Sequence, residues 1–356
     1  MRILHISRTM GQGGAEKVVY QICKDYNDDR LEMFIASTGG IYEKELAKIG
    51  IKHYYIPDLD SKNPIDIIKT LFVLKKIIKE EKIDIIHSHH RMAAFYSKIL
   101  SLFNKKIKRV YTAHNIFHNK KNLLRFALSG SKIVACGDGV KRNLVQFYGI
   151  KEDNVKVIYN SIEKPQKINK PKDKFLEDRD NKILIGTVGR LTEQKGIDIF
   201  LLSIAEIIHK NKNVFAIIIG DGELRDSLKE LAVKFKIENN VKFLGYRRDV
   251  IELISEMDFI VLASRWEGFP LTPIETFSVG KTIIASDIDG NNEIVKNEYN
   301  GLLFEKDNIA ELEKQMNILI NDTKKREELG KNAEKTFEEK FSYKAFISNY
   351  IDVYNE

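Results

Sequence analysis

Short runs of apolar residues recur along the whole chain and alternate with segments of helical periodicity. Most of these runs are continuous stretches of Ile and Val without polar alternation, which is typical of parallel strands covered on both faces. The predicted strands are Ile3–Ser7, Phe34–Ser37, Tyr54–Pro57, Ile83–His87, Val110–His114, Lys132–Gly137, Val155–Asn160, Ile183–Arg190, Val214–Gly220, Val241–Gly245, Phe259–Ser264, Thr282–Ser286 and Gly301–Phe304. Between the runs, apolar residues recur at helical spacing, as in Ala15, Val18, Val19, Ile22 and Tyr26. The pattern predicts an α/β protein built from parallel, doubly wound sheets.

A polar segment separates two series of strands. Residues 161–181 contain Pro165 and Pro171 and show no apolar periodicity, so they are predicted to be a linker. With 356 residues the chain exceeds the size at which one core stops growing, about 250–300 residues. We therefore expect two Rossmann-like domains in tandem, with a ligand site in the cleft between them.

Charge is distributed unevenly between the two halves. Residues 1–165 carry 29 Lys and Arg against 17 Asp and Glu, a net of +12, whereas the remaining residues carry a net of −5. The first half is expected to face something anionic, either nucleic acid or a membrane surface, unless the composition simply favours lysine. No nucleic-acid-binding module accompanies the charge, so nucleic acid is not the expected partner.

Localisation follows from the cysteines and from the lack of long apolar stretches. Cys23 and Cys136 lie far apart in apolar-periodic segments and read as reduced core thiols of a cytoplasmic protein. No stretch of about 18 apolar residues is present, and the first strand is too short for a secretory signal. We expect a cytoplasmic protein that is peripheral at the inner face of the cell membrane if the basic half binds lipid.

A glycine-rich loop follows the first predicted strand. Gly11, Gly13 and Gly14 precede a helix whose N-terminus carries a partial positive charge, which suits an anionic ligand. The third glycine of a dinucleotide fingerprint is misplaced, and the second strand lacks the terminal acidic residue that would bind a ribose. The loop therefore indicates an anion site or only a tight turn, and it disfavours NAD.

Two cations follow the first strand of the second half. Arg190 and Lys195 lie at the carboxyl end of that strand, which is the edge where ligands bind in open α/β sheets. A guanidinium and an ammonium together can neutralise a diphosphate leaving group without a metal. The alternative is that both are solvated charges in a loop.

The segment 265–275, RWEGFPLTPIE, carries a second set of candidate residues. A buried strand delivers Glu267 to a loop, and Pro273 suits the first turn of a helix, which would place Glu275 in that turn. Free amides near Thr272 could bind an anion while the two glutamates hold hydroxyls of the same ligand. The alternative is that Glu275 only complements the helix dipole.

These motifs, in this order, resemble the large family of retaining glycosyltransferases of the GT-B fold. That family includes sucrose synthases, phosphatidylinositol mannosyltransferases and bacterial surface-polysaccharide enzymes. The resemblance rests on GRL-TEQKG at 189–196, on GDGELRDSL at 220–228 and on Glu267-x7-Glu275. It extends to GGAE at 13–16, TAHN at 112–115 and YNSI at 159–162, although the usual Asn-Gly-Val/Ile-Asp is Asn-Ser-Ile-Glu here.

The resemblance implies two Rossmann-like domains whose parallel sheets face each other across a cleft. Residues 1–165 would bind the acceptor, residues 166–341 would bind the nucleotide sugar, and the terminal helix at about 342–356 would pack back on the first domain. It implies a same-face attack with retention, in which Glu267 is not the nucleophile, although a covalent route through Glu267 stays open. It also implies that no metal or other cofactor is required.

The resemblance also assigns roles to individual residues. The implied catalytic residues are Glu267, His114, Arg190 and Lys195. Arg190 and Lys195 would hold the diphosphate, Glu275 the ribose, and His114 would orient the sugar. The remaining implied donor contacts are Gly13, Gly14, Tyr246, Arg247, Gly268, Phe269, Pro270, Leu271 and Thr272.

Two other motifs are given structural interpretations. Asp287-Ile288-Asp289 matches the D-x-D metal motif of another glycosyltransferase fold, but Arg190 and Lys195 already supply the charge, so a loop is favoured. The segment His87-Ser88-His89-His90 contains three histidines in four residues, which is typical of a metal site. However, no Cys or carboxylate nearby completes a tetrahedral set. These histidines are expected to line the acceptor site or to pack near it.

Substrates are predicted only by class. We expect a UDP-linked hexose or N-acetylhexosamine as donor, with a GDP-sugar as the alternative, and a glycan or lipid-linked acceptor for surface polysaccharide. Residues 64–79 are predicted to be mainly a core helix, and the basic, apolar segment 117–126 is preferred for contact with an anionic membrane. The alternatives in function are a catalytically silent nucleotide-sugar-binding subunit and a nucleotide-sugar epimerase of the same fold.

Overall fold

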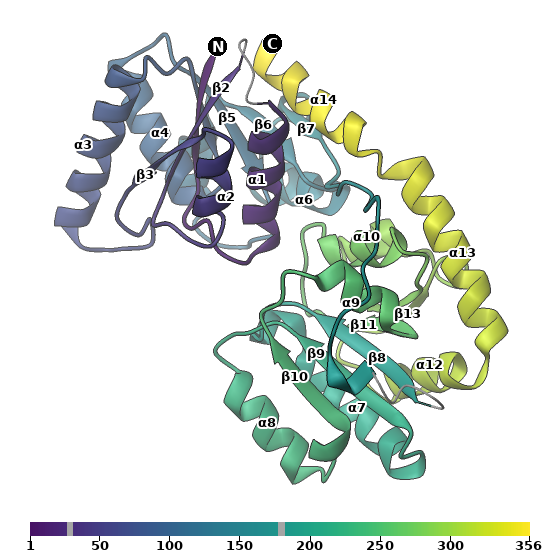
Figure 1. The fold of residues 1–356 in the computed structure, drawn as a ribbon. Helices are drawn as coiled ribbons and strands as arrows, with labels where there is room; N and C mark the ends of the chain where they lie inside the picture. The colour runs from purple at the N-terminus through teal and green to yellow at the C-terminus, as the bar shows by residue number, and fades with distance from the viewer. Residues whose placement is uncertain (27–30, 177–181) are drawn as a thin grey trace. The chain divides into compact units, whose positions relative to one another are not determined.

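The computed structural model describes residues 1–26, 31–176 and 182–356, which form two compact units (Figure 1). The first unit consists of Met1–Asn160 together with Lys344–Glu356, and the second of Ser161–Tyr343. Of the predicted linker, residues 177–181 lie outside the described residues, and the preceding part is irregular apart from one short 3₁₀ turn, η3 (Lys174–Leu176).

Each predicted strand corresponds to a strand of the structure. They are β1 (Arg2–Ile6), β2 (Glu32–Ser37), β3 (Lys52–Tyr55), β4 (Ile85–Ser88), β5 (Lys108–Ala113), β6 (Lys132–Ala135), β7 (Val155–Val157), β8 (Ile183–Val188), β9 (Val214–Ile219), β10 (Val241–Gly245), β11 (Phe259–Leu262), β12 (Ile283–Ser286) and β13 (Leu302–Phe304). Several predicted strands extended one or two residues too far at the carboxyl end. There the chain leaves the sheet, and residues such as Arg190 and His114 lie in loops instead.

The helices fill the intervals between strands. They are α1 (Gly14–Tyr26), α2 (Glu43–Lys48), α3 (Pro64–Glu80), α4 (Arg91–Phe103), α5 (Lys121–Leu128), α6 (Asp138–Arg142), α7 (Ile197–Lys210), α8 (Arg225–Lys234), α9 (Val250–Glu256), α10 (Leu271–Phe277), α11 (Asn291–Ile294), α12 (Ile309–Asn321), α13 (Thr323–Lys340) and α14 (Tyr343–Asn355). Short helical turns are η1 (Asn143–Phe147), η2 (Glu152–Asn154), η4 (Glu193–Lys195) and η5 (Glu238–Asn240).

The first unit is a seven-stranded parallel sheet in the order β3-β2-β1-β4-β5-β6-β7. The strand order reverses between β1 and β4, whose register places His5 opposite His87. Helix α14 completes this unit and is drawn in yellow in Figure 1. Its tyrosines Tyr350 and Tyr354 are fully buried. Tyr354 Oη lies 2.7 Å from His87 Nδ1, so the last helix is tied to the fourth strand.

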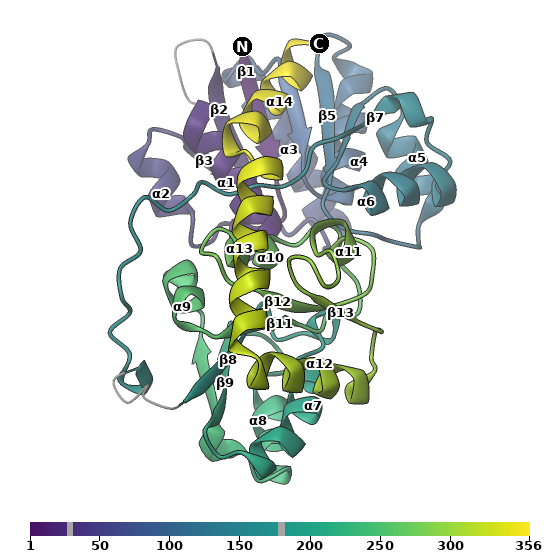
Figure 2. The ribbon, with the colours of Figure 1, turned by 90° about the vertical axis from the view of Figure 1, so that its right-hand side faces the viewer.

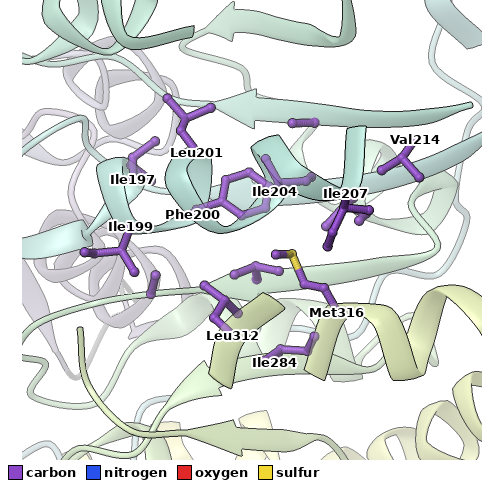
Figure 3. Packing of buried hydrophobic residues seen from close by; sticks show 14 of the residues in the cluster. Ile197, Ile199, Phe200, Leu201, Ile204, Ile207, Val214, Ile284, Leu312 and Met316 are labelled. Atoms are coloured by element: carbon purple, nitrogen blue, oxygen red, sulfur yellow. The ribbon is translucent and has the colours of Figure 1, made fainter. Parts of the chain in front are cut away.

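The second unit repeats the arrangement with six parallel strands in the order β10-β9-β8-β11-β12-β13. Its core lies between the sheet and helices α7 and α12, where Phe200, Ile204, Leu312 and Met316 interdigitate (Figure 3). Helix α13 follows α12 along the chain in the same unit (Figure 2). The continuous Ile and Val runs are buried because helices cover both faces of a parallel sheet.

Helix α3 is a core helix, as predicted, but it also has an exposed apolar side. Leu74, Ile77 and Ile78 are buried in the core of the first unit, and Ile67, Leu71 and Val73 pack against that core. Ile65, Ile68 and Phe72 are 71%, 67% and 69% exposed. Apolar residues therefore occupy both sides of this helix, which a periodicity argument cannot separate into core and surface. No helix in the described parts of the chain is long and apolar enough to cross a membrane.

Candidate active site

The loop after β8 forms the first wall of the site in the second unit. A Cβ on Gly189 would lie 3.1–3.3 Å from three carbons of the Lys195 side chain, so that side chain lies across this glycine. The turn at Gly220–Gly222 packs against the same loop, since a Cβ on Gly220 would lie 1.9 Å from the Gly189 oxygen. The GRL and GDG motifs are thus parts of one tightly packed backbone arrangement.

Lys195 and Glu267 meet directly, although they are 72 residues apart. Lys195 Nζ donates to Glu267 Oε1 at 2.6 Å, and Ser264 Oγ donates to the same oxygen at 2.6 Å. Gln194 Nε2 lies 3.4 Å from the second carboxylate oxygen. Glu267 is only 5% exposed, so its charge is compensated inside the protein by this ammonium and these polar groups.

This arrangement lies at the point where the strand order of the second sheet reverses. Lys195 follows β8, Glu267 follows β11, and these two strands are neighbours. Ligands of open α/β sheets bind outside the carboxyl ends of strands at such a reversal. Arg190 lies at the same edge, and its exposed side chain has no ion-pair partner among the described residues.

The loop that carries Glu267 is held by Arg265, which the sequence reasoning did not single out. Its guanidinium donates to Asp198 at 2.7 and 3.1 Å and to Asp307 at 2.9 Å. These contacts raise the pKa of Arg265, with the hydrogen bond to Asp198 as the largest cause. Gln194 and Ser264 were also missed, because single polar residues in loops give no pattern that predicts their partners.

Helix α10 begins at Leu271, two residues earlier than Pro273 suggested. Glu275 therefore lies in the second helical turn and not in the first, which corrects the prediction. Glu275 and every other residue of this helix are buried. Gly290 supports the preceding loop, since a Cβ there would lie 2.6 Å from the Gly268 oxygen.

Arg247 takes part in a network of charges at the end of β10. Its guanidinium makes paired hydrogen bonds with Asp249 at 2.8 and 2.5 Å and with Asp173 at 2.7 and 2.8 Å. The hydrogen bonds that Arg247 donates to Asp249 first, and to Asp173 second, raise the pKa of Arg247. The arginine thereby fixes residue 173 of the interdomain segment, while the neighbouring Tyr246 is partly exposed.

The glycine loop of the first unit encloses a carboxylate. A Cβ on Gly13 would lie 2.1 Å from Glu16 Oε2, and Thr9 Oγ1 donates to Glu16 Oε1 at 2.7 Å. The Glu16 side chain therefore folds back over Gly13 at the start of α1 and would have to move to admit a larger residue there. The predicted ligand roles of Gly13 and Gly14 stay predictions.

His114 follows β5 and belongs to a group of histidines that strand order brings together. His5, His87 and His89 are buried, and their ring nitrogens lie within 4.8 Å of one another. Sequence reasoning missed His5, because the register of β1 against β4 is not visible in the chain. His90 differs from its neighbours: its side chain accepts from Met92 N at the start of α4.

The Asp287-Ile288-Asp289 segment is a loop, as predicted. Asp287 and Asp289 are both exposed, and Asp287 Oδ1 accepts from Asn292 at 2.8 Å. Among the described residues, the groups of three or more potential metal ligands do not include this pair.

Comparison with known proteins shows that this chain is similar to glycosyltransferases. Residues 169–336 match the family described as glycosyl transferases group 1, and residues 12–164 match the one described as glycosyltransferase family 4. A UDP-Gal:alpha-D-GlcNAc-diphosphoundecaprenol alpha-1,3-galactosyltransferase of Escherichia coli is 30% identical over 280 residues, 73% of this chain and 72% of that protein. An N,N'-diacetylbacillosaminyl-diphospho-undecaprenol alpha-1,3-N-acetylgalactosaminyltransferase of Campylobacter jejuni is 28% identical over 344 residues, 88% of each chain.

Among solved structures, Anabaena Alr3699/HepE in complex with UDP and glucose superposes with a TM-score of 0.87 at 22% identity, covering 100% of both chains. The predicted GT-B fold is therefore confirmed, and the chain belongs to the glycosyl transferases of group 1.

Proposed function

We propose that this glycosyltransferase is a retaining enzyme that moves a hexose or N-acetylhexosamine from a nucleotide diphosphate sugar to a glycan or lipid-linked acceptor in cell-surface polysaccharide synthesis. The observation that carries the proposal is the partly buried Lys195–Glu267 pair, 2.6 Å apart, at the strand-order reversal of the second sheet. A partly buried ion pair at a ligand-binding edge is not needed for packing and costs free energy to desolvate. A role of this pair in binding the donor would explain why it lies at the strand-order reversal.

In this proposal the charge of the leaving diphosphate is stabilised by protein cations. Arg190 has an exposed guanidinium at the carboxyl edge of β8, and Lys195 lies across Gly189 beside it. As the bond from the sugar to the diphosphate breaks, negative charge develops on the phosphate oxygens. Preorganised cations at that position are the largest expected contribution to the rate, and they make a metal unnecessary.

Glu267 is proposed to bind the sugar and not to attack it. One of its oxygens already accepts hydrogen bonds from Lys195 and Ser264, both at 2.6 Å. A carboxylate oxygen engaged in this way is a poor nucleophile, because both donors stabilise its negative charge. Retention would then proceed by attack on the same face of the sugar, with a donor phosphate oxygen accepting the proton of the acceptor hydroxyl. Glu275 is proposed to hold the ribose, and Tyr246 to border the base.

A UDP-sugar is the preferred donor, and a GDP-sugar is the alternative. The Escherichia coli relative is named for UDP-Gal and for an acceptor carried on diphosphoundecaprenol. The Campylobacter relative is likewise named for a diphospho-undecaprenol-linked acceptor. Both names support a lipid-linked glycan as the acceptor class of this chain.

A pocket in the first unit has the chemistry of such an acceptor. Its cavity volume is only about 20 Å³, so it would contact part of an acceptor and not enclose it, and it is lined by Asp60, His90, Arg91, Met92, Lys120, Leu123 and Leu124. Its cationic residues suit a diphosphate, and its leucines suit an apolar chain. The Arg91 guanidinium lies 3.9 Å from the centroid of the Phe117 ring, which fixes its position on the pocket wall.

An anionic membrane is the proposed docking surface for the same unit, and α3 is preferred for this contact over segment 117–126, because its apolar residues are more exposed than Leu123 and Phe126. Ile65, Ile68 and Phe72 lie at spacings of three and four on α3 and are exposed. The exposed lysines Lys69, Lys75, Lys76 and Lys79 lie on the same helix. This combination is typical of a helix that rests on anionic lipid, and the enzyme would act from the cytoplasm at the inner face of the membrane.

The membrane proposal is tested by sedimentation with phosphatidylglycerol-containing vesicles at low and high salt. Phe72→Glu is expected to weaken binding about 10- to 150-fold, since burial of one large apolar side chain contributes about 1.5–3 kcal/mol. Val233→Glu alters an exposed apolar residue of α8 in the second unit and serves as the matched control. Binding that is insensitive to salt and equal in both variants would contradict the proposal.

The catalytic proposal is tested with a panel of UDP- and GDP-sugars. Thermal stabilisation by one donor, with slow release of its sugar that is lost in Lys195→Ala, would support transfer and identify the donor. Lys164→Ala is the control, because it removes the lysine of another Lys–Glu contact of the same unit. Binding without release, even with a lipid-linked acceptor present, would indicate a silent subunit, and the anomeric configuration of the product decides retention.

A further inference from the structure

A chain of buried polar side chains leads to Glu267 from the start of α11 in the second unit. Asn291 Nδ2 donates to Ser286 Oγ at 3.1 Å, and Ser286 Oγ donates to the backbone oxygen of Ser264 at 2.5 Å. Ser264 Oγ in turn donates to Glu267 Oε1 at 2.6 Å. Ser264 follows β11, Ser286 ends β12, and these two strands are neighbours, so the chain runs along the carboxyl edge of the second sheet.

The hydrogen-bonding groups fix the direction of each contact. Carboxylate and carbonyl oxygens only accept, so the Ser264 hydroxyl proton points to Glu267 and the Ser286 hydroxyl proton points to the Ser264 oxygen. The Ser286 hydroxyl has then given its one proton, and the N–H of the last contact comes from the Asn291 amide. Asn291 Nδ2 also donates to the Ser286 backbone oxygen at 3.0 Å, so the reverse orientation of the amide would place two acceptor oxygens together. A single arrangement of protons therefore connects Asn291 to Glu267.

The stability of the fold does not explain this chain. Ser264, Ser286 and Asn291 are all fully buried, and Asn291 Oδ1 accepts no hydrogen bond within the part of the chain that the structure describes. A buried amide oxygen without a donor costs free energy of folding. The Ser286 backbone oxygen also accepts from Ile288 N at 3.0 Å, so it would stay paired without the amide. An apolar side chain at position 291 would thus serve the fold at least as well.

The backbone of the loop that carries Glu267 has separate support. Arg265, which directly follows Ser264, donates to Asp198 at 2.7 Å and to Asp307 at 2.9 Å. These contacts hold the path of the loop without any contribution from the serine hydroxyls. What the hydroxyl chain adds is a contact with the side chain of Glu267 itself.

The two oxygens of the Glu267 carboxylate have different surroundings. Oε1 accepts from Lys195 Nζ and from Ser264 Oγ, each at 2.6 Å. Oε2 has one donor among the described residues, Gln194 Nε2 at 3.4 Å, which is longer than an ordinary N–H···O hydrogen bond. One oxygen is thus anchored by the protein, and most of the accepting capacity of the other is unused.

We propose that Ser264, Ser286 and Asn291 are positioning residues that hold the Glu267 carboxylate in one orientation, with Oε1 anchored and Oε2 left to accept from a ligand hydroxyl. The inference rests on the proposed function, in which Glu267 binds the sugar of the donor. Ser264 acts on Glu267 directly, Ser286 through Ser264, and Asn291 through Ser286. The contributions of the three residues are therefore expected to decrease in that order.

The first experiment removes one hydrogen-bonding group at a time, in Ser264→Ala, Ser286→Ala and Asn291→Leu. Turnover and affinity are measured with the nucleotide sugar that the native protein uses from the panel of UDP- and GDP-sugars, and affinity is also measured with free UDP or GDP. Ser264→Ala is expected to lower kcat/KM for the donor about 10- to 100-fold, with a smaller loss in Ser286→Ala and the smallest in Asn291→Leu. Affinity for the free nucleotide is expected to stay unchanged, because Lys195 and Glu267 are both kept.

Ser203→Ala is the matched control, since Ser203 is another fully buried serine of the second unit, and its hydroxyl donates to Ile199 O at 2.9 Å outside this chain. Ser264→Thr keeps the hydroxyl group and is expected to retain most of the activity that Ser264→Ala loses. Thermal melts accompany every variant, and Asn291→Leu is expected to melt no lower than the native protein. Activity losses that follow the fall in melting temperature, or equal losses of affinity for free nucleotide and nucleotide sugar, would overturn the proposal.

The second experiment does not depend on activity. High-resolution crystal structures without ligand are expected to show one orientation of the Glu267 carboxylate in the native protein and more than one in Ser264→Ala. The same single orientation in both proteins would overturn the proposal. If Ser264→Ala does not fold, Ser286→Ala takes its place in this comparison. If the native protein transfers no sugar, the proposed function fails, whereas the crystal structures still test the positioning role.

Discussion

The two units differ in the charge of the side chains that they place at equivalent positions of similar sheets. In each sheet the strand order reverses once, between β1 and β4 in the first and between β8 and β11 in the second. The second unit places a charged pair there, Lys195 and Glu267, whereas the first places neutral histidines. One architecture therefore provides two electrostatic environments, and the difference comes only from the few residues that follow the strands.

Histidine usage shows the same contrast along the whole chain. Seven of the eight histidines precede residue 160, and the eighth is His209 in the second unit. Several of the seven are buried and neutral, while the charges of the second unit are held in pairs. The first unit is thus expected to be the more sensitive to acid, and the second the more sensitive to removal of a single charge.

The largest expected effect concerns the charged pair. Lys195→Met and Glu267→Gln are each expected to lower kcat/KM about 100- to 1000-fold, because each removes a preorganised group at the reacting centre. Each single change also leaves an uncompensated partner and is expected to lower the free energy of unfolding by about 3 kcal/mol. Thermal melts and steady-state kinetics measure both quantities.

The double variant Lys195→Met/Glu267→Gln sharpens this result. It is expected to recover most of the lost stability, since no unpaired buried charge remains, but none of the activity. Recovery of activity together with stability would show that the pair only supports the fold. That outcome would remove the main contrast between the two units.

The next effect is acid sensitivity of the first unit. In the unfolded chain His5 and His114 regain an ordinary pKa near 6.5, whereas the folded values are about 3 and about 4. The unfolded state therefore binds more protons below pH 6.5, and stability falls as the pH drops from there toward the folded pKa values. Each such ring is expected to lower the free energy of unfolding by on the order of 2 kcal/mol between pH 6.5 and pH 5.

The single tryptophan separates the two units in this measurement. Trp266 lies in the second unit, so its fluorescence reports that unit, while far-ultraviolet circular dichroism reports both. At pH 5 the dichroism transition is expected to begin at a lower temperature than the fluorescence transition, and at pH 7.5 the two are expected to be closer together. A separation that does not depend on pH would contradict the role given to the buried histidines.

The smallest expected effect is that of chelation. Transfer is expected to be unchanged by EDTA, because Arg190 and Lys195 would supply the positive charge that a metal provides elsewhere. A loss of activity that Mg²⁺ or Mn²⁺ restores would show that the cations of the second unit are insufficient. It would also make the exposed Asp287 and Asp289 candidate metal ligands.

The exposed face of α3 shows where the sequence was ambiguous. The apolar residues of 64–79 predicted a helix, and a helix is present, but Phe72 faces solvent while Leu74 is buried. Which apolar side faces the sheet depends on the neighbouring elements, which local spacing does not specify. A similar limit applies to Glu275, since the start of α10 is set by the loop packed around Gly268.

The sequence by itself determined the strand–helix alternation, both parallel sheets and the identity of Arg190, Lys195, Glu267 and His114 as residues at strand ends. These follow from short-range rules: buried parallel strands require continuous apolar runs, and ligand-binding residues follow them. Only the tertiary structure decided that Lys195 meets Glu267 and that His5 joins His89 and His114. Those contacts depend on the order and register of strands that are distant in the chain, and burial then sets their charge states.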